Sequence, residues 1–273
     1  MRVLLTGATQ GIGRATARLL GPLADVLLLH GLESEAEAEP LLSELRRDNP
    51  ATEVAYLSAD YGRLADVGAL AAAVAERVDA LELLVNNAGR PGSPSRMVSA
   101  DGHELTFQAN YLAPVALTSG LLPTLGRAGQ ARVVNVASAT HYSARLQLDD
   151  LELEGDYSAV AAYAHSKLAV VTYTCWLARQ LDGERLDAVS LHPGVISTGL
   201  LHAMFGGGGA PPEHAARNVV DAARQPRGVN GAYFDEDRRA EPNREALEPA
   251  AQERMIAATA AALTAAGVPS PLG

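Results

Sequence analysis

The stretch RVLLTGATQGIG occupies residues 2–13, at the start of the chain. Its first five residues form a nearly continuous apolar run, which predicts a buried strand. Gly7, Gly11 and Gly13 follow in the spacing G-x-x-x-G-x-G, and a helix is expected to begin near Ile12. Glycine lets the backbone turn tightly and approach a pyrophosphate, whose charge is attracted by the N–H groups at a helix start. The stretch therefore predicts a nucleotide-binding loop.

Short apolar runs alternate with longer helical patterns along the rest of the chain. Nearly continuous apolar strands separated by helices predict a parallel sheet covered on both faces. Right-handed crossovers then give an α/β doubly wound sheet of Rossmann type, with about seven strands and helices on both faces. The expected strands are residues 3–6, 25–29, 53–59, 82–87, 132–138 and 186–192, and the clearest helical patterns are residues 13–20, 38–48 and 66–78.

No repeat or long linker divides the sequence, so residues 1–273 are expected to form a single dinucleotide-binding and catalytic domain. The adjacent glycines of FGGGGAPP, at residues 205–212, can hinge but cannot pack. We predict a flexible substrate lid over residues 199–212, with an expendable loop as the alternative. Residues 244–267 are expected to form a C-terminal helical segment.

The composition limits the possible partners and location. Hydrophobic residues make up 48% of the 273 residues, enough for a sizeable core. A net charge of −10, without any stripe of basic residues, argues against nucleic acid and membranes as partners. The most apolar late stretch, residues 255–268, has 14 residues, fewer than the ~20 that span a bilayer. With the first strand leaving no room for a signal peptide, we expect a cytoplasmic protein.

The sequence gives no indication of a disulfide, a metal site or a serine hydrolase. Cys175 is the only cysteine, so no disulfide can form within the chain, and a small buried side chain is its expected role. No histidines and cysteines show the spacing of metal ligands, so no metal is predicted. The absence of a Gly-x-Ser-x-Gly motif argues against a serine hydrolase.

One lysine, Lys167, stands among 22 basic residues, and Tyr163 precedes it by four positions. Surface charges tolerate either arginine or lysine, so a sole lysine is a candidate for a role that guanidinium cannot fill. On the predicted helix, side chains four residues apart face the same way. The pair therefore marks a candidate site.

Five motifs occur in one order along the chain. They are TGATQGIG at 6–13, NNAG at 86–89, Ser138 after an apolar strand, Tyr-x-x-x-Lys at 163–167 and HPG at 192–194. This order resembles the classical short-chain dehydrogenases/reductases over residues 2–234. Tyr163 follows Ser138 by 25 positions, a longer gap than in many members. With YAHSKLA and GAYFDED, this insertion resembles the retinol-dehydrogenase-like branch.

The resemblance implies a catalytic group of Ser138, Tyr163 and Lys167, extended by Asn110. The reaction would be hydride transfer between a nicotinamide and a carbonyl or alcohol carbon, with Tyr163 as general acid and base. A nearby ammonium lowers the pKa of a phenol from about 10, so Lys167 is expected to activate Tyr163. Ser138 would stabilise the substrate oxygen. Asn110 would hold a water that links Lys167 to solvent, or make only a structural hydrogen bond.

The resemblance also implies which residues hold the cofactor. Asp60 would accept from the adenine amino group, and Thr198 would contact a phosphate, whereas Asn87 has a structural alternative. The expected cofactor-binding residues are Gly7, Thr9, Gln10, Gly11, Ile12, Gly13, His30, Asp60, Tyr61, Asn87, Ala88, Gly89, Tyr163, Lys167, Pro193, Gly194, Val195 and Thr198.

The choice between NAD and NADP is weakly marked. NAD-preferring relatives often end the second strand with an aspartate, whereas this chain has His30, Gly31 and Leu32 there. NADP-preferring relatives often carry a basic residue at this place or before the middle glycine, which here is Gln10. Because no carboxylate would repel a 2′-phosphate, we favour NADP over NAD.

The substrate is expected to be a small-molecule carbonyl or alcohol, bulky or apolar. His141 and Tyr142 are predicted to shape its pocket, with a surface position as the alternative for His141. The helices within residues 85–125 and 158–182 could form a homodimer or homotetramer, although monomers also occur in this branch.

Two other functions fit parts of the pattern. Sugar-nucleotide epimerases and dehydratases also carry Tyr-x-x-x-Lys, but usually with a larger C-terminal domain and another glycine spacing. A regulator that senses NAD(P) without turnover commonly lacks the tyrosine or the lysine, and both are present here.

Overall fold

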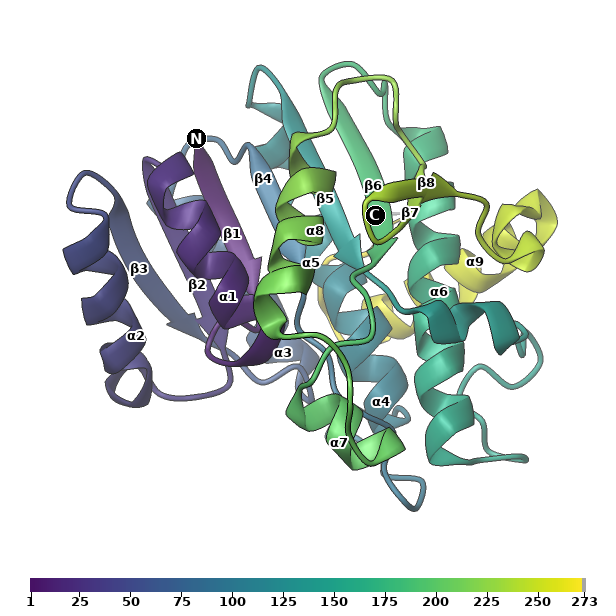
Figure 1. Ribbon diagram of the computed structural model, residues 1–273. Coiled ribbons are helices and arrows are strands. Elements are labelled where there is room, and N and C mark those ends of the chain that lie inside the picture. Colours follow the sequence, from purple (N-terminus) through teal and green to yellow (C-terminus); the bar gives the residue numbers. More distant parts are fainter. Residues whose placement is uncertain (272–273) are drawn as a thin grey trace.

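A twisted sheet runs through the centre of the computed structural model, which describes residues 1–271 (Figure 1). The sheet has eight strands in the order β3-β2-β1-β4-β5-β6-β7-β8. The strands are β1 (Arg2–Thr6), β2 (Val26–Gly31), β3 (Glu53–Ser58), β4 (Leu83–Asn86), β5 (Ala131–Val136), β6 (Leu186–His192), β7 (Tyr233–Asp235) and β8 (Arg238–Ala240). All neighbouring strands pair in parallel except β7 and β8, which are antiparallel. The predicted Rossmann-type α/β domain is confirmed.

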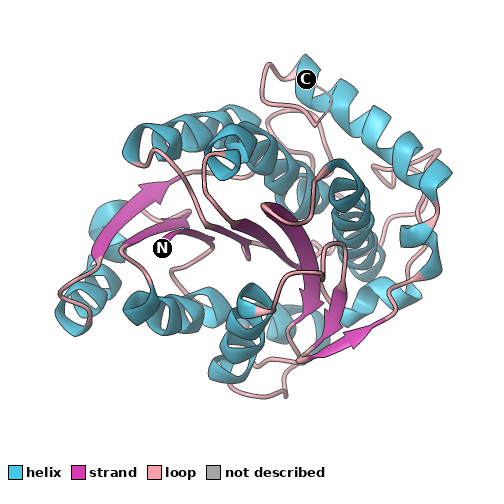
Figure 2. Ribbon diagram, turned by 90° about the horizontal axis from the view of Figure 1, so that it is seen from above, coloured by secondary structure: helices cyan, strands magenta, loops and turns pink. Residues whose placement is uncertain are grey.

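Helices cover both faces of the sheet (Figure 2). The α-helices are α1 (Gly11–Leu20), α2 (Glu35–Asp48), α3 (Leu64–Arg77), α4 (Leu105–Phe107), α5 (Ala113–Gly126), α6 (Ala159–Gln180), α7 (Gly199–Phe205), α8 (Pro212–Arg224) and α9 (Pro249–Ala265). A π-helical turn, η2 (Gln108–Leu112), joins α4 to α5. The short 3₁₀ turns are η1 (Gly21–Leu23), η3 (Ala139–Ser143) and η4 (Arg244–Leu247).

Two apolar cores form because successive strand side chains point to opposite faces. On β1, Leu4 contributes to the core beneath α3, α5 and α6, whereas Val3 and Leu5 contribute to the core beneath α1, α2 and α8. The strands are buried on both faces, which explains why their sequences are continuous apolar runs.

The strand order places a crevice at the carboxyl ends of β1 and β4. After β3 the chain crosses over β1 and adds β4 on its other side, so connections leave these two strands in opposite directions. Ligands bind at such switch points in open α/β sheets. In Figure 1 the strands end at the lower side of the molecule, where α7 also lies.

The insertion before α6 is tied down by hydrogen bonds to the loop that follows β4. The hydroxyl of Tyr157 donates to the carbonyl oxygen of Ser93 at 2.8 Å, and Arg96 donates to the carbonyl oxygen of Glu152 at 3.0 Å. Glu152 also contacts His103 at 2.8 Å. These bonds hold the insertion against the loop that follows β4.

The structure differs from the predicted strand count of about seven. After β7 the chain turns at Glu236, which has a left-handed backbone with φ of +58°, and pairs back as β8. This strand, Arg-Arg-Ala, is exposed at the sheet edge and has no apolar pattern that could have marked it. Within residues 1–271, no helix combines the length and apolar character needed to cross a membrane.

Candidate active site

The glycine loop after β1 is shaped by close backbone approaches. Gly7 and Gly11 have φ of +64° and +50°, a region that favours glycine. A Cβ on Gly13 would lie 1.9 Å from the carbonyl oxygen of Gly7, and one on Gly7 would lie 2.8 Å from the Cα of Ala88. No side chain caps the start of α1 and its first turn carries no acidic residue, so this helix end is suited to an anion.

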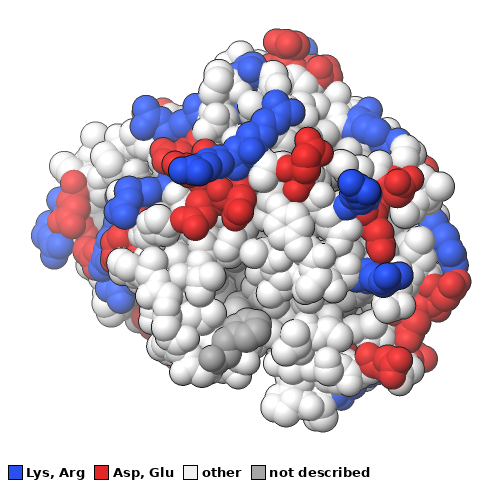
Figure 3. Space-filling view, turned by 45° about the vertical axis from the view of Figure 1, so that its right-hand side comes forward, with Lys and Arg blue, Asp and Glu red and all other residues white. Residues whose placement is uncertain are grey.

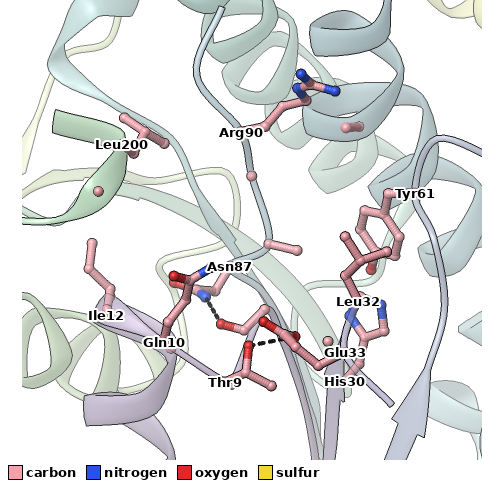
Figure 4. A pocket seen from close by; sticks show the side chains of 18 of the residues that line it. Thr9, Gln10, Ile12, His30, Leu32, Glu33, Tyr61, Asn87, Arg90 and Leu200 are labelled. Atoms are coloured by element: carbon pink, nitrogen blue, oxygen red, sulfur yellow. Dashed lines mark hydrogen bonds between the residues drawn. The ribbon is translucent and has the colours of Figure 1, made fainter. Parts of the chain in front are cut away.

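A cavity of about 660 Å³ opens above this loop. Figure 4 shows it from close by, with Ile12 and Gln10 on one side, Tyr61 on the other and Leu200 of α7 facing them. Most of the predicted cofactor-binding residues line it. They are Gly7, Thr9, Gln10, Gly11, Ile12, Gly13, His30, Asp60, Tyr61, Asn87, Ala88, Gly89 and Thr198.

His30 and Tyr61 form one wall of the cavity as a stacked pair. Their rings lie 4.7 Å apart, nearly parallel, and the Nε2 atom of His30 contacts the carbonyl oxygen of Ala59 at 3.1 Å. Burial lowers the pKa of His30 to about 4, so its ring is neutral at physiological pH. Both side chains offer flat apolar surface to a ligand.

Glu33 is a cavity residue that the sequence analysis missed. Its carboxylate accepts a hydrogen bond of 2.9 Å from the Thr9 hydroxyl and faces the glycine loop (Figure 4). Residues 30–32 hold no carboxylate, as expected, but the next residue, Glu33, brings one into the cavity. A signal was present, since Glu33 follows Gly13 by 20 positions, the usual offset of a ribose-binding acid in dinucleotide folds.

Asn87 holds the loop after β4 against the glycine loop. Its Nδ2 atom donates to the carbonyl oxygens of Thr6 and Gly7, at 2.9 and 3.2 Å. The Thr6 hydroxyl in turn accepts from the backbone N–H of Ala88 at 3.0 Å. Asn87 thus lines the cavity and also braces it, which is its predicted structural role, and its contact with a cofactor stays a prediction.

Ser138, Tyr163 and Lys167 come together behind this cavity. Ser138 follows β5, and Tyr163 and Lys167 lie one turn apart on α6. The Ser138 hydroxyl lies near the Tyr163 phenol and lowers its pKa, and the Lys167 ammonium is 5.7 Å from the centre of the Tyr163 ring. None of these three residues lines the cavity, but Gly89 does. Lys167 lies directly behind Gly89, since a Cβ on this glycine would be 3.4 Å from the Lys167 Nζ atom.

The pKa of Tyr163 differs from the sequence expectation. Burial raises it to about 12, and the hydrogen bond from Ser138 only partly offsets this. Burial also lowers the pKa of Lys167 to about 8, while its ammonium donates to the carbonyl oxygen of Val136 at 2.9 Å. In this state Tyr163 is a proton donor at neutral pH.

Asn110 lies in the π-helical turn η2 and is buried. Its Oδ1 atom accepts the backbone N–H of Arg90 at 2.7 Å, and its Nδ2 atom donates to the Arg90 carbonyl oxygen at 3.0 Å. Nδ2 also donates to the Ser166 hydroxyl at 3.0 Å. The side chain therefore fixes the loop after Gly89 beside Lys167, the structural alternative for this residue.

The turn after β6 leads from Pro193 to α7. The Asn218 side chain donates to the Pro193 carbonyl oxygen at 3.1 Å, and Gly194 has φ of +104°. Pro193, Gly194 and Val195 do not line the cavity, and Val195 is exposed. Thr198 lines it and caps α7 by accepting the backbone N–H of Leu201.

His141 and Tyr142 are neighbours in the chain, but His141 is buried and Tyr142 is exposed. His141 is fully buried, so it lies neither in a pocket wall nor on the surface, the two places expected for it. Its neighbour Tyr142 is 44% exposed and donates a hydrogen bond to the carbonyl oxygen of Glu241. The sequence cannot show which of these two side chains is buried. Both lie on the 3₁₀ turn η3, and the segment around Asn243 that covers it is about a hundred residues away in the chain.

Comparisons with known proteins agree with this geometry. A family model described as short chain dehydrogenase matches residues 1–206. The chain belongs to the short-chain dehydrogenase family. Polyprenol dehydrogenase of Homo sapiens is 36% identical over 74% of this chain and 62% of its own length, so the match spans less than two thirds of that relative. Retinol dehydrogenase 13 of Homo sapiens is 30% identical over 94% of this chain and 83% of its own.

A solved structure extends the similarity over the whole fold. The crystal structure of an uncharacterised protein from Mycobacterium paratuberculosis superposes with a TM-score of 0.80 at 26% identity. The match covers 99% of this chain and 94% of that one. This short-chain dehydrogenase is thus an NAD(P)-dependent oxidoreductase of alcohol and carbonyl groups, in the retinol-dehydrogenase-like branch predicted from its insertion.

Proposed function

We propose that the chain moves a hydride reversibly between a bound nicotinamide cofactor and the alcohol or carbonyl carbon of a bulky apolar substrate. Tyr163 would exchange the proton of the substrate oxygen, Ser138 would hold that oxygen, and Lys167 would supply a fixed positive charge. One observation carries the proposal. The chain's sole lysine lies beside the Tyr163 ring, which Ser138 also neighbours, and its ammonium is directly behind Gly89 of the cavity wall.

The glycine loop and cavity fit a dinucleotide. Gly7 and Gly13 let the backbone close up where a Cβ would clash with it, and the uncapped start of α1 is suited to a pyrophosphate. His30 and Tyr61 would pack along the adenosine, while Gly89 would admit the nicotinamide ribose beside Lys167. When bound, the nicotinamide supplies or accepts the hydride.

Each catalytic side chain has a distinct task in carbonyl reduction. With its raised pKa, Tyr163 is protonated and can donate to the substrate oxygen as general acid. Ser138 accepts the backbone N–H of Thr140 at 3.3 Å, and its hydroxyl would turn its one proton from Tyr163 to the substrate oxygen as negative charge develops there. The Lys167 ammonium would favour the phenolate left behind. In alcohol oxidation the same proton moves the other way.

The surroundings of the site favour an apolar substrate. Leu200 of α7 lines the cavity, and Val195 and Tyr142, on the turns after β6 and β5, are exposed. Figure 3 shows mostly uncharged surface over the lower left of the face it presents, whereas charged side chains gather over the upper part and the right-hand side. The names of two relatives, a polyprenol and a retinol dehydrogenase, also point to long apolar alcohols. We therefore propose alcohols, aldehydes or ketones of this kind, admitted beneath α7 acting as a lid.

Glu33 changes the preferred cofactor. A carboxylate held beside Thr9 can accept hydrogen bonds from ribose hydroxyls, whereas it would repel a 2′-phosphate. We propose NAD as the preferred cofactor, in place of the NADP favoured from the sequence.

Tyr163→Phe tests the function. The phenol proton is lost while the ring and the cavity remain, so carbonyl-dependent oxidation of the reduced cofactor should fall at least a hundredfold, with cofactor affinity unchanged within about twofold. Activity would be followed by cofactor absorbance and affinity by cofactor fluorescence, with a panel of apolar ketones, aldehydes and alcohols. Unchanged turnover would remove Tyr163 from the mechanism, and cofactor binding without turnover by the wild type would indicate a sensor instead.

A further inference from the structure

We infer that His141 is a positioning residue for Ser138, and that it transmits the position of the C-terminal segment 241–245 to the active site. The inference rests on the proposed function of Ser138. It follows from the two ring nitrogens of His141, each of which has one partner.

The Nδ1 atom of His141 lies 2.7 Å from the carbonyl oxygen of Ser138. The backbone N–H of His141 reaches the same oxygen at 3.1 Å. Two donors on one carbonyl fix the peptide plane after Ser138, and this fixes the direction in which the Ser138 side chain leaves the backbone.

The Nε2 atom of His141 accepts the backbone N–H of Asn243 at 3.3 Å. Because a backbone N–H can only donate, Nε2 must be the unprotonated nitrogen, and the proton must be on Nδ1. The Ser138 carbonyl can only accept, so both contacts require the same tautomer. The contact with Asn243 therefore reinforces the tautomer and the ring position that give the Ser138 carbonyl its second hydrogen bond.

Asn243 secures the same turn with its side chain. Its Nδ2 atom donates to the carbonyl oxygens of His141 and Ala144, at 2.9 and 3.0 Å. The rings of Tyr142 and Tyr233 pack against the imidazole, with centroids 4.0 and 4.7 Å away. With no exposed surface and both nitrogens bonded, His141 cannot reach a substrate, so its effect on catalysis must pass through Ser138.

A matched pair of variants separates the two nitrogens. The amide nitrogen of His141→Asn can take the place of Nδ1 and donate to Ser138, whereas the carbonyl of His141→Gln can take the place of Nε2 and accept from Asn243. We expect His141→Asn to keep kcat within about threefold and His141→Gln to lose roughly tenfold or more, with cofactor affinity unchanged in both. Equal losses, or the reverse order, would overturn the inference.

A double-mutant cycle shows whether the effect passes through Ser138. We expect His141→Gln to lower kcat in the wild type but to change it less than about twofold on a Ser138→Ala background. Arg254→Ala serves as the control, since it removes the ion pair of α9 with Asp149 without touching segment 241–245 or His141, and should leave kcat unchanged.

The outcomes distinguish this inference from the proposed function. Independent, multiplying losses in the cycle would make His141 a stability residue only and overturn the inference, while leaving Ser138 catalytic. If Ser138→Ala itself left kcat unchanged, the proposed role of Ser138 would fall, and the inference with it. Thermal unfolding of every variant, recorded alongside, identifies any loss of activity that comes from unfolding.

Discussion

Lys167 is a positive charge in a place that disfavours charge. The side chain is 4% exposed and lies between Gly89 and Val136, with one backbone carbonyl as its hydrogen-bond partner. Folding therefore removes an ammonium from water without giving it a counter-ion, and the pKa falls to about 8. A compact ammonium fits this space, whereas a planar guanidinium with five donors would leave most of them unpaired. Such a residue benefits function at a cost in stability.

Replacing this lysine should reveal that cost. In wild type the folded-state pKa lies below the unfolded value, so the penalty is complete below pH 8 and is relieved as pH rises toward 10.5. Lys167→Met should be at least as stable at pH 7, by up to roughly 3 kcal/mol, while losing nearly all activity. Urea unfolding at pH 7 and pH 10 measures this. The advantage should shrink at pH 10, and a variant less stable than wild type at pH 7 would contradict the account.

Substituting Glu33 tests whether one carboxylate decides between NAD and NADP. Its partner Thr9 belongs to the glycine loop, so the charge lies where the adenosine ribose is expected. Glu33→Gln keeps the shape and removes the charge, and should improve NADPH binding roughly tenfold, about 1.4 kcal/mol. Fluorescence titration with NADH and NADPH measures both affinities. As a control, Glu35→Gln removes the same charge from a residue that does not line the cavity, and should change neither the NADH nor the NADPH affinity. A wild type that prefers NADPH would refute the assignment of Glu33.

At the scale of elements, prediction from sequence succeeded wherever local pattern decides structure. Apolar runs predict six of the strands. The glycine spacing predicts the loop after β1, where the backbone approaches other backbone atoms too closely for a Cβ. The prediction missed a short hairpin strand without an apolar pattern, and features that residues far apart in the sequence create. β8 exists because the turn at Glu236 returns the chain to a sheet edge, and the place of Glu33 depends on a turn toward Thr9. Likewise, η3 is buried by residues near Asn243.

We expect α7 to act as a lid whose base, the Ile196–Ala210 bridge, depends on Gly209. Gly206 to Gly209 all have positive φ, between +78° and +118°, and Ile196 pairs with Ala210 below them. A Cβ on Gly209 would lie 2.7 Å from the Val195 carbonyl oxygen, whereas one on Gly208 would meet nothing within 4 Å.

These two glycines form a matched pair. Both alanine variants have an unfavourable backbone, but only Gly209→Ala also clashes with the base of α7. We expect Gly209→Ala to raise KM for the apolar substrate several-fold more than Gly208→Ala, with cofactor affinity little changed. Steady-state kinetics and limited proteolysis within residues 199–212 measure the effect. Equal kinetics for the two variants would argue against a lid anchored at this point.

At the scale of the whole molecule, the C-terminal helix covers the surfaces suggested for oligomers. The Trp176 indole of α6 donates to Glu253 of α9 at 3.3 Å, and Tyr111 bonds Thr259 at 2.8 Å. Beyond α9, Pro269 would lie 3.1 Å from a Cβ on Gly120 of α5. Residues 85–125 and 158–182 are thus partly occupied by the chain itself.

We therefore expect a monomer of 28.5 kDa. Light scattering after size exclusion, at several protein concentrations, gives the mass directly. Glu253→Ala breaks the contacts of α9 with Trp176 and Arg179, and should lower the unfolding temperature without changing that mass. A concentration-independent mass twice the chain's own would show that another surface pairs two copies.

The scarcity of lysine has a practical outcome for anyone handling this enzyme. Within residues 1–271 Lys167 carries the one side-chain primary amine, and it is enclosed behind Gly89. Acylating reagents should consequently leave the side-chain amines of the folded enzyme unmodified. A lysine adduct, located by mass spectrometry, would report that this amine has become reachable, and bound dinucleotide should suppress it.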